Sequence, residues 1–229
     1  MTEVERQALW LSLQVASVAT LLVLPVALGL AFALARGHWP GKALVETLVN
    51  LPLVLPPVVI GYALLVSLGR QGWLGRWLHE TLGITLVFSF RGAVLAAGVM
   101  ALPLMVRALR QAIEAIDLGL EAAARTLGAS RLDAFFSVTL PLAAPGLLSA
   151  VVLGFAASLG EFGATITFVS NVPGQTQTLP LAIYSALQSP DGDAAAARLV
   201  LCSAVLAFAA LGFAQWGHRR LQRWLGQVA

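Results

Sequence analysis

Side chains with the chemistry for catalysis or metal binding are few and widely separated in this sequence. Glu161 is the only acid deep within an apolar run, and no second group suited to acid–base chemistry accompanies it there. The three histidines, His38, His79 and His218, lie far apart and lack the spacing of metal ligands. The motifs of a phosphate-binding loop, a serine nucleophile elbow and a zinc protease are absent. The sequence therefore predicts no catalytic residue, no metal site and no nucleotide site.

The most polar stretch of the chain, at 107–141, indicates a mechanical role instead. It carries four Arg and four acids between two apolar runs. Residues 118–127 favour a helix, which Gly128 can end because glycine tolerates the left-handed backbone at a helix terminus. A second short helix is expected at 131–138, before Pro141 opens the next run at a position where its missing N–H costs little. Two stiff helices with a sharp bend predict a segment in water that another protein can grip.

The surface of this polar segment also fits a docking role. The three alanines at 122–124 are small, so a partner groove can approach them closely. Composition alone fits an ordinary amphipathic loop as well. The spacing favours docking, because Glu121 precedes the alanines, Gly128 follows, and an aliphatic-x-Leu140-Pro141 motif comes nine residues later. Large apolar side chains of the second short helix would form a knob, namely Leu132, Phe135 and Phe136.

The composition is that of a membrane protein. Hydrophobic residues make up 59% of the chain and charged residues 11%, against about 25% charged in soluble domains, and the mean hydropathy is +0.84. A helix needs about 20 residues to cross the hydrocarbon of a bilayer. We therefore expect an all-α, polytopic membrane helical bundle that forms one domain over 1–229. Five apolar runs are long enough for its transmembrane helices: 10–35, 43–68, 92–109, 142–169 and 199–216.

The connections between these runs set the orientation and leave the number of spans open. A sixth span within 171–197 stays open, although its apolar middle at 179–187 is short. A Trp-rich stretch predicts an interfacial helix at 73–82. Nine Lys and Arg lie in the connections on one side and five on the other. The positive-inside rule then puts the N-terminus outside and the polar segment, at about 111–141, in the cytoplasm.

Three further features narrow the functional classes. The net charge of +3 comes from basic residues scattered at the ends of apolar runs, so nucleic-acid binding is not expected. Cys202 is the sole cysteine and excludes a disulfide framework within one chain. Glu3 and Glu5, together with a first apolar run too long for a signal peptide, argue against a cleaved leader.

These motifs resemble the permease subunits of molybdate-type, binding-protein-dependent ABC importers. The polar segment is similar to the coupling segment, or EAA loop, of that superfamily, except that Ala122 stands where many members have a second polar residue. The Gly-Glu-Phe-Gly stretch at 160–163 and the proline-rich run at 51–62 are more specific and resemble the molybdate permeases. The resemblance covers about 10–216, including 89–95, 102–107, 158–171 and 180–184.

The resemblance implies a type I ABC importer transmembrane domain, lying among lipids of a bacterial inner membrane. It implies a homodimer that works with two ABC ATPase subunits and with a periplasmic or surface oxyanion-binding protein. The ATPases would hold ATP and Mg, with no cofactor in this chain, and molybdate would enter the cytoplasm by alternating access. The implied ATPase-coupling residues are Glu121, Ala122, Ala123, Ala124, Gly128, Leu140 and Pro141.

Prolines in the second apolar run predict a break in its helix. Pro52, Pro56 and Pro57 each remove a backbone donor, and the freed carbonyls need neighbouring donors or a water-lined cavity. A kink that serves packing alone would explain them. We favour a broken helix that lines the translocation path, with Gly61 permitting the close approach of a neighbour.

Glu161 is expected near the outer membrane face, because about 24 Å of helix separates it from Pro145. A buried acid in a membrane is functional by default, although a structural, hydrogen-bonding Glu is the alternative. Its carboxylate would repel a dianion, so we expect it to accept backbone N–H bonds at a gate instead of binding cargo. The expected path and gate residues are Pro56, Pro57, Gly61, Gly160, Glu161, Phe162, Gly163 and Thr165.

Alternatives to molybdate import stay open at this point. Tungstate and sulfate are tetrahedral dianions of similar shape, and the selecting pocket would lie in the binding protein, outside this chain. A polytopic membrane enzyme could use Glu161 as acid or base if a paired buried group lay beside it in space. A passive channel or scaffold would not need the polar segment.

Overall fold

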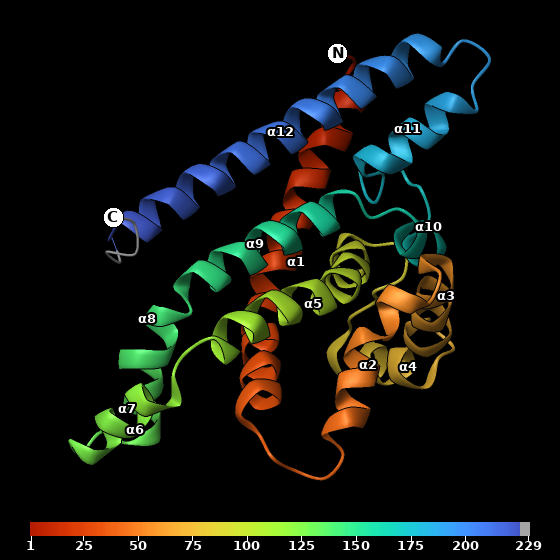
Figure 1. Ribbon diagram of the computed structural model, residues 1–229. Helices are drawn as coiled ribbons and strands as arrows, with labels where there is room; N and C mark the ends of the chain where they lie inside the picture. Colours follow the sequence, from red (N-terminus) through yellow and green to blue (C-terminus); the bar gives the residue numbers. More distant parts are fainter. Residues whose placement is uncertain (225–229) are drawn as a thin grey trace.

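The structure is a computed structural model that describes residues 1–224, and this part of the chain is helical without a strand (Figure 1). The side chain of His218 lies outside the described part. The elements are α1 (Glu3–Arg36), α2 (Lys42–Val54), α3 (Pro57–Leu68), α4 (Trp73–Leu82), α5 (Phe90–Glu114), α6 (Leu118–Thr126), α7 (Arg131–Ala134), the π-helical turn η1 (Phe135–Thr139), α8 (Leu140–Leu142), α9 (Ala144–Leu159), α10 (Gly163–Val169), α11 (Leu179–Leu187) and α12 (Asp193–Trp224).

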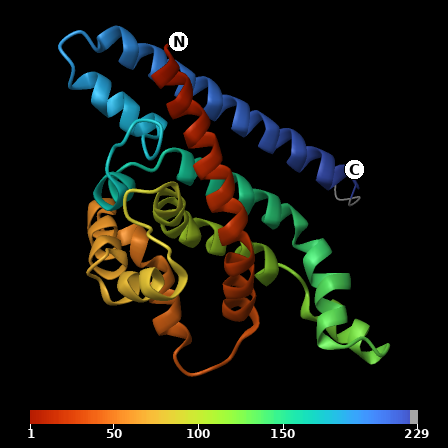
Figure 2. The same cartoon turned by 180° about the vertical axis from the view of Figure 1, so that it is seen from behind.

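Three long helices, α1, α5 and α9, pack against one another at the centre (Figures 1 and 2). Small residues form much of these contacts, as is usual between helices in membranes. A Cβ on Gly154 of α9 would lie 2.5 Å from the Sδ of Met105 on α5, so glycine fits there without a shift of Met105. The alanines that the packing buries completely include Ala16, Ala19, Ala27 and Ala31 on α1, Ala93, Ala96, Ala97 and Ala101 on α5, and Ala150 on α9.

The second apolar run is broken at its prolines, as the sequence predicts. α2 and α3 meet at an angle of 115°, so the expected span at 43–68 is not one straight helix. Pro57 is the first residue of α3, where the missing N–H is not needed by the helix. After the bend, α3 packs against the short helix α10.

The fourth apolar run is also divided, which corrects the expected single span at 142–169. α9 ends at Leu159 and a separate helix, α10, begins at Gly163. At its other end, α7, η1 and α8 form a helical arm, Arg131–Leu142, that meets α9 at 68°. Pro141 therefore lies inside this arm, and Pro145 opens α9 instead.

The number of spans lies between three and five for the described residues. α1, α5 and α12 are long and apolar enough to cross a membrane, and counting each of the two bent pairs as one span gives five. The stretch 171–197 holds α11 and the first residues of α12, and the nine residues of α11 extend about 14 Å, too short for a sixth span. α4 and α11 coincide with the short helices expected at 73–82 and 179–187.

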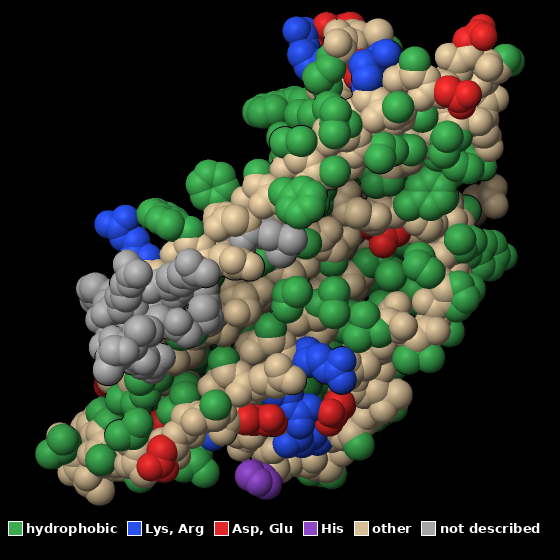
Figure 3. Space-filling view, turned by 45° about the horizontal axis from the view of Figure 1, so that its top comes forward, with side chains coloured by type: hydrophobic (Ala, Val, Ile, Leu, Met, Phe, Trp, Pro, Cys, Tyr) green, Lys and Arg blue, Asp and Glu red, His purple; other side chains and the backbone are tan. Residues whose placement is uncertain are grey.

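Charged side chains gather mainly at two ends of the molecule, with a largely uncharged surface between them (Figure 3). At one end, Arg198 of α12 binds the Glu5 carboxylate of α1 at 2.7 Å. At the other end, Arg110 of α5 lies 2.6 Å from Glu46 of α2 and 2.7 Å from Glu114. This distribution is that of a chain crossing a bilayer, and the polar segment extends from the second end.

Candidate functional site

The polar segment at 111–141, which we call the coupling segment after the motif it resembles, contains two capped helices in succession. Asp117 caps α6, because its carboxylate accepts the N–H of Gly119 at 2.8 Å. Ser130 caps α7 and forms a reciprocal capping box with Asp133, at 3.1 Å in each direction. α5 runs to Glu114, so the first residues of the expected segment at 111–141 belong to the preceding helix. The bent pair of helices expected from the sequence is present.

Gly128 forms the bend between these two helices. Its φ is +97°, a conformation that side chains with a Cβ rarely adopt. A Cβ added there would meet no atom within 4 Å, so the backbone angle alone requires glycine. The bend is thus fixed by conformation and leaves open space around it for another protein.

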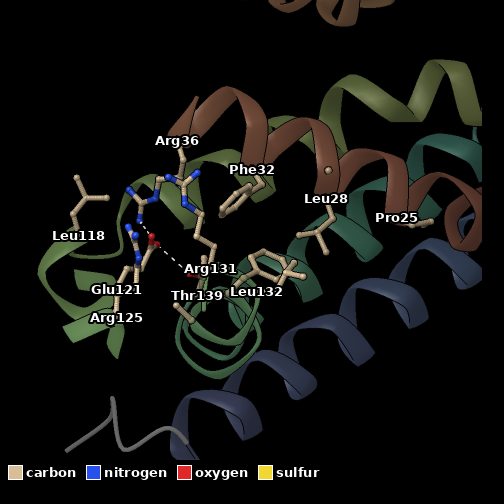
Figure 4. Close-up of a pocket in the computed structure, with 13 residues that line it drawn as sticks. Pro25, Leu28, Phe32, Arg36, Leu118, Glu121, Arg125, Arg131, Leu132 and Thr139 are labelled. Atoms are coloured by element: carbon tan, nitrogen blue, oxygen red, sulfur yellow. Dashed lines mark hydrogen bonds and ion pairs between the residues drawn. The ribbon is translucent and has the colours of Figure 1, made fainter. Parts of the chain in front are cut away.

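Glu121 points into its own chain (Figure 4). Its Oε1 lies 3.1 Å from Nη2 of Arg36, at the end of α1, and accepts the hydroxyl of Thr139 at 3.0 Å. The same Arg36 nitrogen donates to the carbonyl of Ile116 at 3.0 Å. One guanidinium and one carboxylate therefore hold α1, the start of α6 and the helical arm together.

The outward surface of the coupling segment includes apolar side chains among charged and polar ones. Ala122 and Ala123 are exposed, as are Leu132 and Phe136 of the expected knob. Phe135 was expected in the knob, which is wrong, because its ring packs edge-on against Phe32 of α1 at 5.0 Å.

Leu127 is 89% exposed and was not singled out from the sequence. A large aliphatic residue just before the bend-forming glycine was the available signal. Leu140, half-buried, and Pro141, exposed, lie further along the arm, in α8. The role of these residues in ATPase contact stays a prediction.

Glycines bring the broken helix α3 against α10. A Cβ on Gly61 would lie 2.6 Å from the carbonyl oxygen of Ala164, so the two backbones touch. A Cβ on Gly163 would lie 2.8 Å from Cβ of Pro57. Three residues predicted from two distant stretches, Pro57, Gly61 and Gly163, thus lie at the contact of α3 with α10, while Pro56 precedes α3 and is exposed. Their role in a pathway stays a prediction.

Glu161 lies in the break between α9 and α10 and is 8% exposed. Its Oε1 accepts the N–H of Ala164 at 2.7 Å, so the carboxylate caps the start of α10, as the electrostatic argument expects. Within the described residues, no ion pair or side-chain hydrogen bond reaches Glu161. An acid–base pair bonded to Glu161, as an enzyme would use, is therefore not formed among the described side chains.

The remaining expected gate residues differ in exposure. Phe162 packs against Tyr184 of α11 at 5.2 Å, and Gly160 is exposed. Thr165 is 1% exposed, so its side chain is buried inside the protomer and reaches no open path there. Among the described residues, no group of three His, Cys, Asp or Glu side chains could hold a metal ion.

A helical bundle with several apolar spans and a polar segment extending from one end defines a class, the multi-pass permease subunits of inner membrane transporters. The family described as binding-protein-dependent transport system inner membrane component matches residues 25–223, and the chain belongs to this family. It is accordingly a permease subunit of the ABC importer kind.

Two relatives are similar over nearly their whole length. The molybdenum transport system permease protein ModB of Escherichia coli (strain K12) is 56% identical over 216 residues, 94% of each chain. The protein of the same name from Haemophilus influenzae is 52% identical over 223 residues, 97% of each chain. Among solved structures, a bacterial ABC transporter that imports the acidic polysaccharide alginate shares the fold, with a TM-score of 0.77, 19% identity and coverage of 96% of this chain and 80% of that one.

Proposed function

We propose that this chain is the membrane subunit of an ATP-driven importer that carries molybdate into the cytoplasm. It acts as a homodimer with two ATPase subunits, which bind ATP and Mg, and receives its cargo from an oxyanion-binding protein outside the membrane. The observation that carries the proposal is the 56% identity, over 94% of both chains, with a permease named for molybdenum transport.

The geometry supports a mechanical transmission from the ATPases to the pathway. When two ATPases close, they pull the coupling segments of the two protomers together. Glu121 and Arg36 pass that movement to α1, and the helical arm passes it to α9. α9 leads into the Glu161-capped α10, which touches the broken helix at Gly61. Closure on one side is thereby linked to opening on the other.

Substrate selection belongs to the external binding protein in this proposal. Glu161 accepts a backbone N–H and is 8% exposed, so its carboxylate is held inside the protomer and is not a ligand for a dianion. A conduit needs only weak contacts with its cargo, since tight binding would slow release. The path residues therefore shape and gate the opening.

Uptake into proteoliposomes tests this function. The chain is reconstituted with its ATPase subunit, and binding protein is added outside with radioactive molybdate. We expect ATP-dependent uptake that stops when ATP is left out. Tungstate or sulfate is tested as competitor and as sole cargo. Uptake of sulfate but not of molybdate would contradict the molybdate assignment, and equal uptake without ATP would favour a passive channel.

A further inference from the structure

A cavity of about 670 Å³ lies between the cytoplasmic half of α1 and the coupling segment (Figure 4). The proposed transport mechanism uses the Arg36–Glu121 pair at one end of this cavity and gives its apolar wall no role. Apolar residues of α1 form one wall, and three arginines lie toward one end. The wall includes Pro25, Gly29 and Phe32, and the basic end includes Arg36, Arg125 and Arg131.

The basic end has more positive charge than its neighbours neutralise. Three guanidinium groups surround one carboxylate, that of Glu121, which pairs with Arg36. Within residues 1–224, neither Arg125 nor Arg131 forms an ion pair. The Nε of Arg36 is buried and has no hydrogen-bond partner among the described residues. Guanidinium groups bind phosphate through paired N–H bonds, so this end suits a phosphate group.

The apolar wall has the length of a lipid tail. Pro25 and Arg36 are separated by about 16 Å along α1, which is close to half of the roughly 30 Å hydrocarbon layer. Gly29 lies midway, and a Cβ there would meet no atom within 4 Å, so the wall is open at this level. A free inorganic anion has no apolar part, so contact with this wall would not stabilise its binding.

We propose that this cavity binds one anionic phospholipid of the cytoplasmic leaflet. The phosphate lies among Arg36, Arg125 and Arg131, and an acyl chain follows α1 toward Pro25. Basic pockets between membrane helices on the cytoplasmic side are sites where anionic lipid headgroups bind. Because Arg36 also holds Glu121, the bound lipid stiffens the joint between α1 and the coupling segment. A free cytoplasmic oxyanion shares the phosphate chemistry and is the rival occupant.

Native mass spectrometry of the full chain tests the proposal. The protein is purified in detergent, stripped of lipid, and given phosphatidylglycerol or phosphatidylcholine at equal concentration. We expect one retained phosphatidylglycerol per chain and at least tenfold less phosphatidylcholine. Arg125→Gln with Arg131→Gln should lower phosphatidylglycerol retention about tenfold. The matched control, Arg70→Gln with Arg76→Gln, removes two exposed arginines outside the cavity and should change nothing.

A second variant separates lipid from free anion. Gly29→Phe fills the apolar wall while every arginine stays, so it should lose phosphatidylglycerol as the double variant does. Equal retention by wild type and both variants would overturn the proposal. Displacement of the lipid by millimolar phosphate or molybdate, with Gly29→Phe binding these anions like wild type, would assign the site to a free oxyanion. The readout is independent of cargo, so a chain that retains lipid but moves no molybdate contradicts only the proposed function.

Discussion

Single residues in this chain determine the backbone angle at the bend of the coupling segment and the orientation of two carboxylates. Gly128 has a left-handed φ with free space around it, so its requirement is conformational. Glu161 and Glu121 are both acids that turn inward, one onto a helix N-terminus and the other onto an arginine. The sequence predicted the backbone bond of Glu161, whose partner Ala164 lies three residues away. It did not predict the inward turn of Glu121, because Arg36 lies 85 positions away.

Replacing Gly128 should uncouple the transporter. A β-branched residue at this φ costs roughly 1–3 kcal/mol and would open the bend between α6 and α7. We expect Gly128→Val to lower ATPase binding or ATP-driven uptake severalfold, measured by co-purification and by liposome uptake. Gly83→Val is the matched control, because Gly83 also has a positive φ and open space but ends α4. Normal assembly and transport in Gly128→Val would refute the coupling role.

Two substitutions of Glu161 should separate the effect of its hydrogen bond from the effect of its charge. Glu161→Gln keeps an acceptor for the Ala164 N–H, so assembly should persist and gating should change only modestly. Glu161→Ala leaves that buried N–H without its acceptor, at a cost of about 1–3 kcal/mol, and should destabilise the closed state. Leak of molybdate in liposomes without ATP measures the difference. A leak equal in both variants would show that the charge itself matters.

At the scale of whole helices, the coupling segment contacts the rest of the chain at few points. The coupling segment is joined to α1 by the Arg36–Glu121 pair and by the edge-on contact of Phe135 with Phe32. Short elements such as α4 and α11 were predictable, because Gly72, Gly83 and Pro180 mark their ends in the sequence. The 115° bend at Pro56 and the inward turn of Phe135 were not, since proline predicts a break without its angle and a helix face is chosen by packing.

Breaking the Arg36–Glu121 pair should loosen the coupling segment without unfolding the spans. Arg36→Glu puts two carboxylates face to face and leaves the Ile116 carbonyl without its donor. We expect at least tenfold slower transport, with ATP hydrolysis less dependent on cargo. The double variant Arg36→Glu, Glu121→Arg restores the pair and should recover part of the transport. No recovery would mean that Glu121 acts through the ATPase and not through α1.

The whole molecule is a multi-pass permease subunit of the ABC importer kind. Its surface carries charge mainly at two ends, and its coupling segment is exposed at one of them (Figure 3). Composition was sufficient to predict a multi-pass helical membrane protein, because hydropathy depends on no tertiary detail. It did not predict that the fourth run divides into α9 and α10. In the proposed homodimer a second protomer shares the pathway, so one chain does not determine its lining.

This chain alone should bind no nucleotide, because the sequence has no phosphate-binding loop. Photo-crosslinking with azido-ATP should label the ATPase subunit in the assembled complex and leave this chain at background. The ATPase band in the same sample is the positive control. Labelling of the isolated chain that unlabelled ATP competes away would contradict the prediction.

The ion pair between Glu5 and Arg198 can form only late in the synthesis of the chain. The two residues are 193 positions apart, and Ser12 likewise accepts the N–H of Leu179 from 167 positions away. At about 5–20 residues per second, the ribosome needs roughly 10–40 s between making the first partner and the last. During that interval Glu5 has only its local partners, the N-terminal amine at 3.9 Å and the N–H of Thr2 at 2.8 Å. The pairing of α1 with α12 at this end therefore forms only when synthesis is nearly complete, and a chain that stops before α12 leaves Glu5 without the Arg198 guanidinium.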